Sequence, residues 1–322
     1  MTGKLRCAIL DDYQDAAMRH ADWGGLAERL DFTVFDRWIE PASRAEELAP
    51  FEIIVAMRER TVFDADLLSA LPRLRLLVTT GMVNASIDME AAAARDITVS
   101  GTRGRVGPAA ELAWGLLLAL TRKIPQESRL FAESSDRWQH GVGRDLLGLT
   151  LGVAGLGRLG SLVAGYGKAF GMDVLGWSRN NTPERSAELG VGYCASLDAL
   201  LEQSDVVSLH LTLNEETRGI IGRDAFARMK PGAMLINTSR GPLVDEAALV
   251  DALREGRIAG AGLDVFDAEP LAADHPLRKL DNVVATPHLG YVTQQTYDLY
   301  YRDAVEGIGA WLDGNPVRVL NG

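Results

Sequence analysis

Short apolar runs alternate along this chain with segments whose apolar residues recur at helical spacing. In the N-terminal third, the runs that predict β-strands lie at residues 6–10, 32–35, 53–56 and 76–79. Helical spacing between these runs is clearest at residues 65–70 and 89–94. Strands that alternate with helices are typical of a parallel α/β sheet, so this third of the chain predicts a small open-sheet domain.

The rest of the chain repeats the alternation. Further strands are predicted at residues 149–154, 174–177, 206–211, 234–237, 262–265 and 283–285. Residues 100–104 indicate a loop where the chain passes between domains, and residues 131–140 indicate a polar connector. Residues 108–122 predict a long helix that is apolar on nearly every side, so it must be buried in a core or an interface. The whole pattern predicts an α/β fold with two open parallel-sheet domains.

A glycine-rich turn follows the strand predicted at residues 149–154. It comprises Gly155, Leu156, Gly157, Arg158, Leu159 and Gly160, with its glycines in G-x-G-x-x-G spacing. The first glycine permits a sharp turn, the second leaves room for a pyrophosphate, and the third lets the following helix pack closely on the strand. Free N–H groups at the start of that helix would face the phosphates. The turn therefore predicts a dinucleotide site.

The end of the next predicted strand bears on which dinucleotide binds. An Asp or Glu there would bond the adenosine ribose hydroxyls of NAD, and none stands in Trp177-Ser-Arg-Asn180. Ser178 and Arg179 suit a 2′-phosphate instead, because Arg presents a planar, permanently charged fork. The expected cofactor is NAD(P), leaning to NADP, although Asn180 could still serve NAD.

Three later strand ends carry residue types that hydride transfer at an alcohol carbon requires. Arg240 can grip a carboxylate or an α-keto oxygen through its fork. His288 can take the hydroxyl proton in oxidation or donate one in reduction. Glu269, bonded to that ring, would favour its protonated form and fix its orientation. Because ligands bind beyond the carboxyl ends of parallel strands, the three residues together predict a catalytic site.

Each of these residues also has a plain structural interpretation. Arg240 could form a surface ion pair, Glu269 could stand in a turn, and His288 could be a satisfied core histidine. Their occurrence at successive strand ends favours catalysis. His210, at the end of another predicted strand, is expected to line the cofactor cleft rather than to transfer protons.

Two loops of the N-terminal domain follow strands and could reach a substrate. One contains Arg58 and Arg60, either of which could meet an anion or pair with surface acids. The other contains Gly81, Met82 and Val83, where backbone N–H groups could hold a carboxylate.

Composition narrows the range of partners. The net charge is −11, with 33 Lys and Arg against 44 Asp and Glu. This argues against nucleic acid and anionic membranes, because phosphate binding needs clustered cations. Cys7 and Cys194 lie far apart without His or Cys at ligand spacing, so neither a disulfide framework nor a metal site is expected. The sequence has no signal-peptide core or bilayer-length apolar run, and a cytoplasmic location is expected.

Six stretches of the sequence resemble, in the same order, those of the D-isomer-specific 2-hydroxyacid dehydrogenases. They are GVAGLGRLG at 152–160, SLHLTLNEETR at 208–218, MKPGA at 229–233, NTSRGPLVD at 237–245, GLDVFDAEP at 262–270 and NVVATPHLG at 282–290. The resemblance covers almost the whole chain. It implies two Rossmann-like domains: a substrate domain formed from both chain ends, residues 1–100 and 289–322, and a dinucleotide-binding domain at residues 101–288.

The resemblance also implies roles for residues within these stretches. It supports the catalytic set Arg240, Glu269 and His288. It adds cofactor contacts from Thr238 and from Asp264, which would hold the nicotinamide carboxamide.

Outside these stretches, the resemblance implies that the loop at Gly81 receives the substrate carboxylate and that the helix at residues 108–122 forms a homodimer. The sequence departs from the family's pattern at Ser100, where Asn is common, and at residues 106–108, where polar residues are common. Tyr291 stands where a small residue is common and is expected to shape the substrate pocket.

The expected function is the interconversion of a small 2-keto acid and its D-2-hydroxy acid. One alternative is a phosphoglycerate dehydrogenase without a regulatory domain, because the loop at Arg58 resembles that enzyme's loop and the chain stops near residue 322. A more distant alternative is a dinucleotide-sensing protein like the C-terminal-binding corepressors, which keep the same three catalytic-type residues. Glu269 argues against the formate dehydrogenase branch, which carries Gln there.

Overall fold

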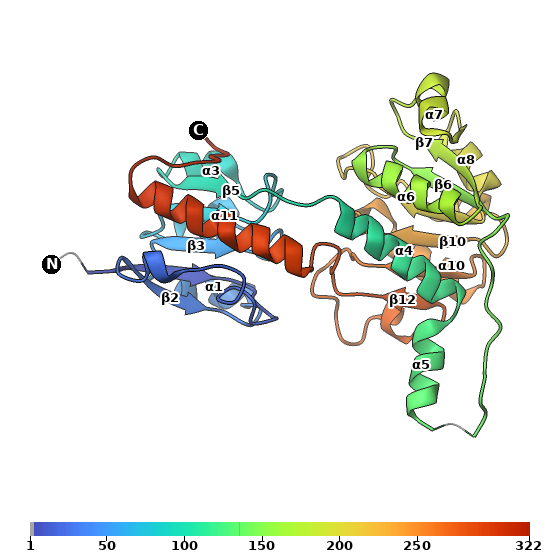
Figure 1. The fold of residues 1–322 in the computed structure, drawn as a ribbon, viewed down its shortest axis with the longest axis horizontal. Helices are drawn as coiled ribbons and strands as arrows, with labels where there is room; N and C mark the ends of the chain where they lie inside the picture. The colour runs from blue at the N-terminus through green and yellow to red at the C-terminus, as the bar shows by residue number, and fades with distance from the viewer. Residues whose placement is uncertain (1–2, 135) are drawn as a thin grey trace. The chain divides into compact units, whose positions relative to one another are not determined.

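The chain forms two compact units in the computed structural model, which describes residues 3–134 and 136–322 (Figure 1). Unit 1 comprises the chain up to Arg105 together with Val292–Gly322, and unit 2 comprises Val106–Tyr291. Each unit is a sheet of parallel strands with helices packed against it. The predicted α/β class is confirmed, with one of the two domains built from both ends of the chain.

Unit 1 contains five strands in the order β2-β1-β3-β4-β5. The strands are β1 (Leu5–Ile9), β2 (Leu30–Val34), β3 (Ile53–Ala56), β4 (Leu76–Thr79) and β5 (Thr98–Gly101). The helices are α1 (Pro41–Leu48), α2 (Ala65–Ser69), α3 (Met89–Ala93) and α11 (Gln294–Leu312), with a 3₁₀ turn η1 (Gly24–Leu26). The C-terminal helix α11 contacts β4 and β5 and lies along this sheet in Figure 1. The end of the chain therefore completes the core of the N-terminal domain.

The loop predicted at residues 100–104 begins later than expected. Ser100 and Gly101 are the last two residues of strand β5, so the prediction was wrong at these positions. Neither Ser nor Gly favours strands strongly by itself. The strand is held by β4 on one side and by the end of the chain on the other, where Gly101 N donates to Arg318 O at 2.9 Å. Arg318 is 217 residues from Gly101 in the chain, so the hydrophobic pattern around residue 101 could not predict this pairing.

Unit 2 contains seven strands in the order β12-β11-β10-β9-β6-β7-β8. The strands are β6 (Thr150–Ala154), β7 (Asp173–Trp177), β8 (Gly192–Tyr193), β9 (Val206–Leu209), β10 (Met234–Asn237), β11 (Gly260–Leu263) and β12 (Val283–Ala285). The helices are α4 (Gly107–Thr121), α5 (Ile124–Ala132), α6 (Arg158–Ala169), α7 (Pro183–Leu189), α8 (Leu197–Gln203), α9 (Arg223–Arg228) and α10 (Glu246–Arg254), with 3₁₀ turns η2 (Gly241–Leu243) and η3 (Pro276–Lys279). The strand order reverses at β6, and ligands of open α/β sheets bind at such a reversal.

The apolar helix predicted at residues 108–122 is α4. This helix packs on α6 and β11, and its side chains Trp114, Leu116 and Leu117 are among those that are buried. Helix α5 follows directly and occupies the start of the connector predicted at residues 131–140, so that prediction was wrong at its first two residues. Ser135, inside the predicted connector, lies outside the described residues. Among the helices that the structure describes, none is long and apolar enough to cross a membrane.

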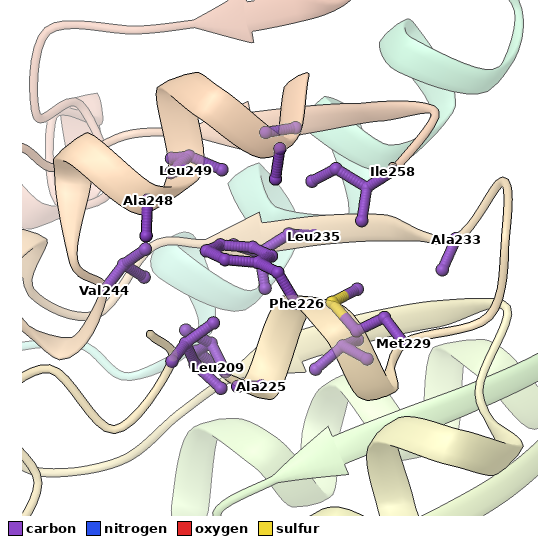
Figure 2. Packing of buried hydrophobic residues seen from close by; sticks show 14 of the residues in the cluster. Leu209, Ala225, Phe226, Met229, Ala233, Leu235, Val244, Ala248, Leu249 and Ile258 are labelled. Carbon is purple, nitrogen blue, oxygen red and sulfur yellow. The ribbon is translucent and has the colours of Figure 1, made fainter. Parts of the chain in front are cut away.

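The central strands of unit 2 are buried on both faces. Leu235 of β10 belongs to one apolar cluster, which includes Phe226 and Ile258 (Figure 2). The next residue of β10, Ile236, belongs to a second cluster with Val153 of β6. Successive side chains of a strand point to opposite faces, and a strand buried on both faces gives the continuous apolar run seen in the sequence. This core holds the strand ends described below in place.

Candidate functional site

The glycine turn lies at the carboxyl end of β6. Gly155 has a φ of +103°, and its N–H donates to Trp177 O of β7 at 2.7 Å. A Cβ atom on Gly155 would lie 2.5 Å from the carbonyl oxygen of His210, and one on Gly160 would overlap the carbonyl oxygen of Gly155. The first glycine is therefore needed for the turn, and the third for the close approach of α6 to β6.

The middle glycine has a different environment. Gly157 caps the start of α6, and nothing lies within 4 Å of the position that its Cβ would take. The first N–H groups of a helix have no helical partner, so an anion can approach the backbone here. Leu156 is buried beside Gly176 of β7, whereas Gly157 and Arg158 are exposed. The turn fits the pyrophosphate of a dinucleotide.

Ser178 and Arg179 lie in a turn at the carboxyl end of β7. Asn181 N donates to Ser178 O at 3.0 Å and closes this turn. The Arg179 side chain is 50% exposed, and its guanidinium forms an ion pair with Glu216, which follows β9. Arg179, which is expected to bind a 2′-phosphate, therefore lies at the end of β7 and is paired with a carboxylate that was not predicted from the sequence.

His210 comes directly after β9, which ends at Leu209, two residues earlier than predicted. Its Nε2 lies 2.8 Å from Ser208 Oγ, and its Nδ1 atom is buried. Burial lowers the pKa of His210 to about 4, so the ring is neutral near pH 7. A histidine in this state is suited to lining a cleft rather than to exchanging protons at neutral pH.

Asp264 follows β11 and is fully buried. Its carboxylate accepts hydrogen bonds from Thr286 Oγ at 2.6 Å, from Leu289 N at 2.6 Å and from Gly290 N at 2.8 Å. Burial raises the pKa of Asp264, and these three donors partly oppose that rise. The carboxylate thus anchors the segment on both sides of His288.

His288 is at the centre of this anchored segment. Its Nδ1 lies 2.6 Å from Glu269 Oε2, and its ring packs edge-on against Tyr291 with centroids 5.6 Å apart. The other carboxylate oxygen of Glu269 accepts a hydrogen bond from Phe266 N at 2.9 Å. His288 has a φ of +55°, an unfavourable backbone conformation of the kind that clusters at active sites. Because Nδ1 faces Glu269, Nε2 is the nitrogen that can meet a substrate.

Arg240 and Thr238 lie on the loop after β10. Arg240 is half-buried and Thr238 is buried. Gly241, the next residue, lies so close to the backbone of Phe266 that a Cβ atom would overlap it. The loop that carries Arg240 therefore packs on the loop that leads to Glu269.

In unit 1 the loops after β3 and β4 pack together. Arg58 N donates to Thr80 Oγ at 2.8 Å, and its guanidinium donates to Thr80 O at 3.2 Å. The same guanidinium lies where a Cβ atom of Gly81 would be. Met82 and Val83 follow and are exposed. The structure therefore brings together Arg58 and the loop at residues 81–83, two of the features expected to meet a substrate.

The Gly81 N–H and the Arg58 guanidinium already have partners within unit 1. Gly81 N donates to Thr102 Oγ at 2.8 Å, so this N–H is not the donor expected for a substrate carboxylate. Arg58 Nε lies 3.4 Å from Glu59 Oε2, and both side chains are mostly buried. The charge of the arginine is therefore balanced by an adjacent acid.

Arg60 has different surroundings from Arg58. Its Nη1 donates to Asp11 O at 2.6 Å, and its guanidinium stacks over the Tyr13 ring at 4.6 Å. The Tyr13 hydroxyl donates in turn to Asp11 Oδ1 at 3.1 Å, and burial raises the pKa of Asp11. Arg60 thus ties the loop after β3 to the end of β1.

Sequence reasoning missed Thr286, Glu59 and Glu216. Thr286 could have been found, because it follows β12, the neighbour of the strand β11 that precedes Asp264. Glu59 lies between the two arginines, where its charge is visible in the sequence. Glu216 gives no local signal, since its importance depends on the strand order. Within residues 3–134 and 136–322, no group of three or more His, Cys, Asp or Glu side chains is arranged to hold a metal.

Comparison with known proteins agrees with this geometry. Residues 114–290 match the NAD-binding domain of the D-isomer-specific 2-hydroxyacid dehydrogenases. The chain belongs to this family. The matching domain is the NAD-binding domain of these dehydrogenases, and a similar D-lactate dehydrogenase from Aquifex aeolicus was solved with NAD bound. These findings support a nicotinamide dinucleotide as the cofactor of this chain.

Several relatives of this chain are known. It is 39% identical over 311 residues to the glyoxylate reductase of Aeropyrum pernix, covering 92% of this chain and 91% of the relative. It is 40% identical over 281 residues to the D-3-phosphoglycerate dehydrogenase of Mycobacterium tuberculosis, covering 86% of this chain. The chain spans about half of that relative, 53% of its length. A solved phosphoglycerate oxidoreductase from Vibrio cholerae is 36% identical, with a TM-score of 0.90 over 96% of this chain and 99% of that one.

Proposed function

We propose that this dehydrogenase transfers a hydride between NAD(P)(H) and C2 of a small D-2-hydroxy acid or 2-keto acid. The observation that carries the proposal is the pair of His288 and Glu269, joined at 2.6 Å, with His288 on a segment that Asp264 anchors. Reduction of a ketone needs one hydride and one proton. An oriented imidazole in a dinucleotide-binding unit supplies the proton.

The residues of unit 2 have the following proposed roles. The bound cofactor supplies or accepts the hydride. His288 Nε2 gives its proton to the keto oxygen in reduction and takes the hydroxyl proton in oxidation. Glu269 holds the ring in the orientation that this transfer needs. Arg240 binds the carboxylate or keto oxygen of the substrate, and Tyr291 shapes the space beside the imidazole. Asp264 contacts the nicotinamide carboxamide besides anchoring the segment that carries His288.

Unit 1 is the proposed substrate domain. Arg58, with its guanidinium beside Gly81, is the stronger anion contact of the two arginines in the loop after β3. The guanidinium of Arg60 stacks on Tyr13 and donates to Asp11, which favours a structural role. The backbone beyond Gly81, at Met82 and Val83, would contribute the remaining substrate contacts.

Arg240→Lys is expected to lower kcat/KM for the keto acid by about 10- to 100-fold, mainly through a higher KM. A charged hydrogen bond contributes about 1.5–3 kcal/mol, and a lysine cannot reproduce the two-pronged contact of a guanidinium. Initial rates over a range of hydroxypyruvate concentrations measure the change. Arg223→Lys, at an exposed ion pair with Asp251, is the control, and an unchanged kcat/KM in Arg240→Lys would remove Arg240 from the substrate site.

We propose that the preferred cofactor form is NADP. The support is the turn after β7, where Ser178 and Arg179 stand and the acid typical of NAD sites is missing. Arginine binds phosphate through a planar fork that stays charged at all physiological pH values.

The alternative substrate is a phosphorylated one, as in a phosphoglycerate dehydrogenase. The support is the similarity to proteins of that name and the arginine at residue 58. The pair of Arg58 and Glu59 weighs against it, because the glutamate balances the charge that a phosphate would need. An unphosphorylated keto acid with a single carboxylate is therefore the favoured substrate.

Glu59→Gln is expected to raise kcat/KM for phosphohydroxypyruvate, relative to hydroxypyruvate, by about three- to tenfold. The substitution keeps the size of the side chain and removes the charge that repels a phosphate, an effect of about 1 kcal/mol when water screens the two charges. The ratio of the two kcat/KM values is the measurement. Glu90→Gln, on an exposed part of α3, controls for the change in net charge, and an unchanged ratio in Glu59→Gln would show that Arg58 does not face the substrate's distal group.

We further propose that the protein is a cytoplasmic homodimer. Large apolar side chains are exposed on and after α5: Ile124, Phe131, Trp138 and Val142 are 52, 72, 79 and 91% exposed. Exposed apolar groups gathered in one segment mark interaction surfaces. Both cysteines are free and buried, which fits a reducing compartment.

A panel assay tests the proposed reaction. Purified protein is mixed with NADPH or NADH and with glyoxylate, hydroxypyruvate, pyruvate, phenylpyruvate or phosphohydroxypyruvate, and absorbance is followed at 340 nm. A loss of absorbance with at least one unphosphorylated keto acid is expected. No loss with any pair would favour the corepressor-like alternative, a protein that binds the dinucleotide without turning it over.

A further inference from the structure

We propose that Glu216 sets the choice between NAD and NADP by controlling Arg179. The inference rests on the proposed function in one respect, the placement of the adenosine ribose at the end of β7. Neither the glycine turn nor the catalytic-type residues of unit 2 can distinguish the two cofactors. NAD and NADP share the pyrophosphate and the nicotinamide that those residues would contact.

The sheet order brings the two side chains together. β7 and β9 are the neighbours of β6 on its two sides, and β6 ends in the glycine turn. Arg179 follows β7 and Glu216 lies in the turn after β9, yet their side chains form an ion pair. A carboxylate from one neighbour of β6 thus meets a guanidinium from the other, at the edge of the sheet where a dinucleotide binds.

Both partners stand on turns that are internally bonded. Asn214 Oδ1 accepts hydrogen bonds from Glu216 N at 3.1 Å and from Thr217 N at 3.0 Å. The Thr217 hydroxyl, which is buried, donates to Thr212 O at 2.7 Å. These bonds hold the backbone of Glu216 in place, so its side chain extends toward Arg179 from a fixed point.

The pair affects the two cofactor forms in opposite ways. A 2′-phosphate is attracted by Arg179 and repelled by Glu216. A ribose 2′-hydroxyl can donate to a carboxylate, so Glu216 supplies, from the turn after β9, the acid that is missing at the end of β7. Both side chains are at least half exposed, at 50% and 71%, and an ion pair of this kind is weak enough for a bound phosphate to open. Glu216 therefore reduces, without reversing, the preference for NADP that Arg179 confers.

The test measures binding, so it does not depend on turnover. NADPH and NADH are titrated calorimetrically into wild type, Glu216→Gln and Glu215→Gln, the last being an exposed neighbour with the same charge change. Glu216→Gln should raise the ratio of NADPH to NADH affinity by about five- to tenfold, and Glu215→Gln by less than about twofold. An unchanged ratio in Glu216→Gln, or an equal change in both variants, overturns the inference.

A double variant tests the route through Arg179. Arg179→Gln should weaken NADPH and leave NADH nearly unchanged, and the gain from Glu216→Gln should fall to less than half when it is added to Arg179→Gln. A gain of undiminished size in the double variant would show that Glu216 acts without Arg179, which contradicts the proposal. If the protein binds both cofactors but reduces no keto acid, the proposed reaction fails while these affinity ratios still decide the role of Glu216.

Discussion

His288→Ala is expected to lower kcat for keto-acid reduction by about 10²- to 10⁴-fold, the range usual for losing a general acid–base group. The variant keeps Arg240 and the glycine turn, so KM for the keto acid and the affinity for the cofactor should change far less than kcat. The reason is that the imidazole acts on the proton that moves during the reaction rather than on the charges that hold the ground state. Steady-state kinetics with hydroxypyruvate and NAD(P)H measure both constants.

A second histidine provides the control for this experiment. His140 also lies beside a glutamate, with its Nδ1 at 3.5 Å from Glu127 Oε2, but it follows helix α5 and stands at no strand end of the sheet. His140→Ala should keep the wild-type kcat. Turnover of His288→Ala at the wild-type rate would refute the proposed role of His288.

Gly160→Ala is expected to destabilise unit 2 even without cofactor. The added Cβ would overlap the carbonyl oxygen of Gly155, so α6 must move away from β6. Overpacking of this kind costs about 1–3 kcal/mol, which corresponds to a fall in Tm of about 3–10 °C for a domain of this size. Thermal unfolding of the cofactor-free protein, followed by circular dichroism, measures the loss.

Gly157→Ala should give the opposite pattern. Nothing lies within 4 Å of the added methyl group, so the Tm of the cofactor-free protein should stay within about 2 °C of wild type. The methyl group would occupy the space through which the pyrophosphate approaches the backbone, so Kd for the dinucleotide should rise at least about tenfold. Equal destabilisation by both substitutions, or unchanged cofactor affinity in Gly157→Ala, would contradict the separate roles given to the two glycines.

The strands that carry the site could be predicted closely from the sequence. β3, β4, β10 and β12 have the predicted bounds. The first three are buried along their whole length, and strands covered on both faces give near-continuous apolar runs that can be recognised in the sequence. Arg240 and His288 follow two of these strands, so chain order alone was enough to assign them to the same edge of the sheet.

Features that depend on contacts between distant segments could not be predicted. β5 is stabilised partly by the end of the chain, and Glu216 meets Arg179 only because β9 and β7 flank β6. Arg58 and Arg60 look alike in sequence, two residues apart. Only the folded loop separates them, since one guanidinium lies beside Gly81 and the other is bound to the end of β1.

Transfer of deuterium from labelled cofactor to the product tests the central proposal most directly. NADPH and NADH, each deuterated on one or the other face of nicotinamide C4, are incubated with hydroxypyruvate or pyruvate, and the product is examined by mass spectrometry and chiral chromatography. Label from one face of the cofactor is expected at C2 of the D-hydroxy acid, and its appearance should slow in His288→Ala in proportion to kcat. A product without deuterium at C2, or one with the L configuration, would contradict the proposal.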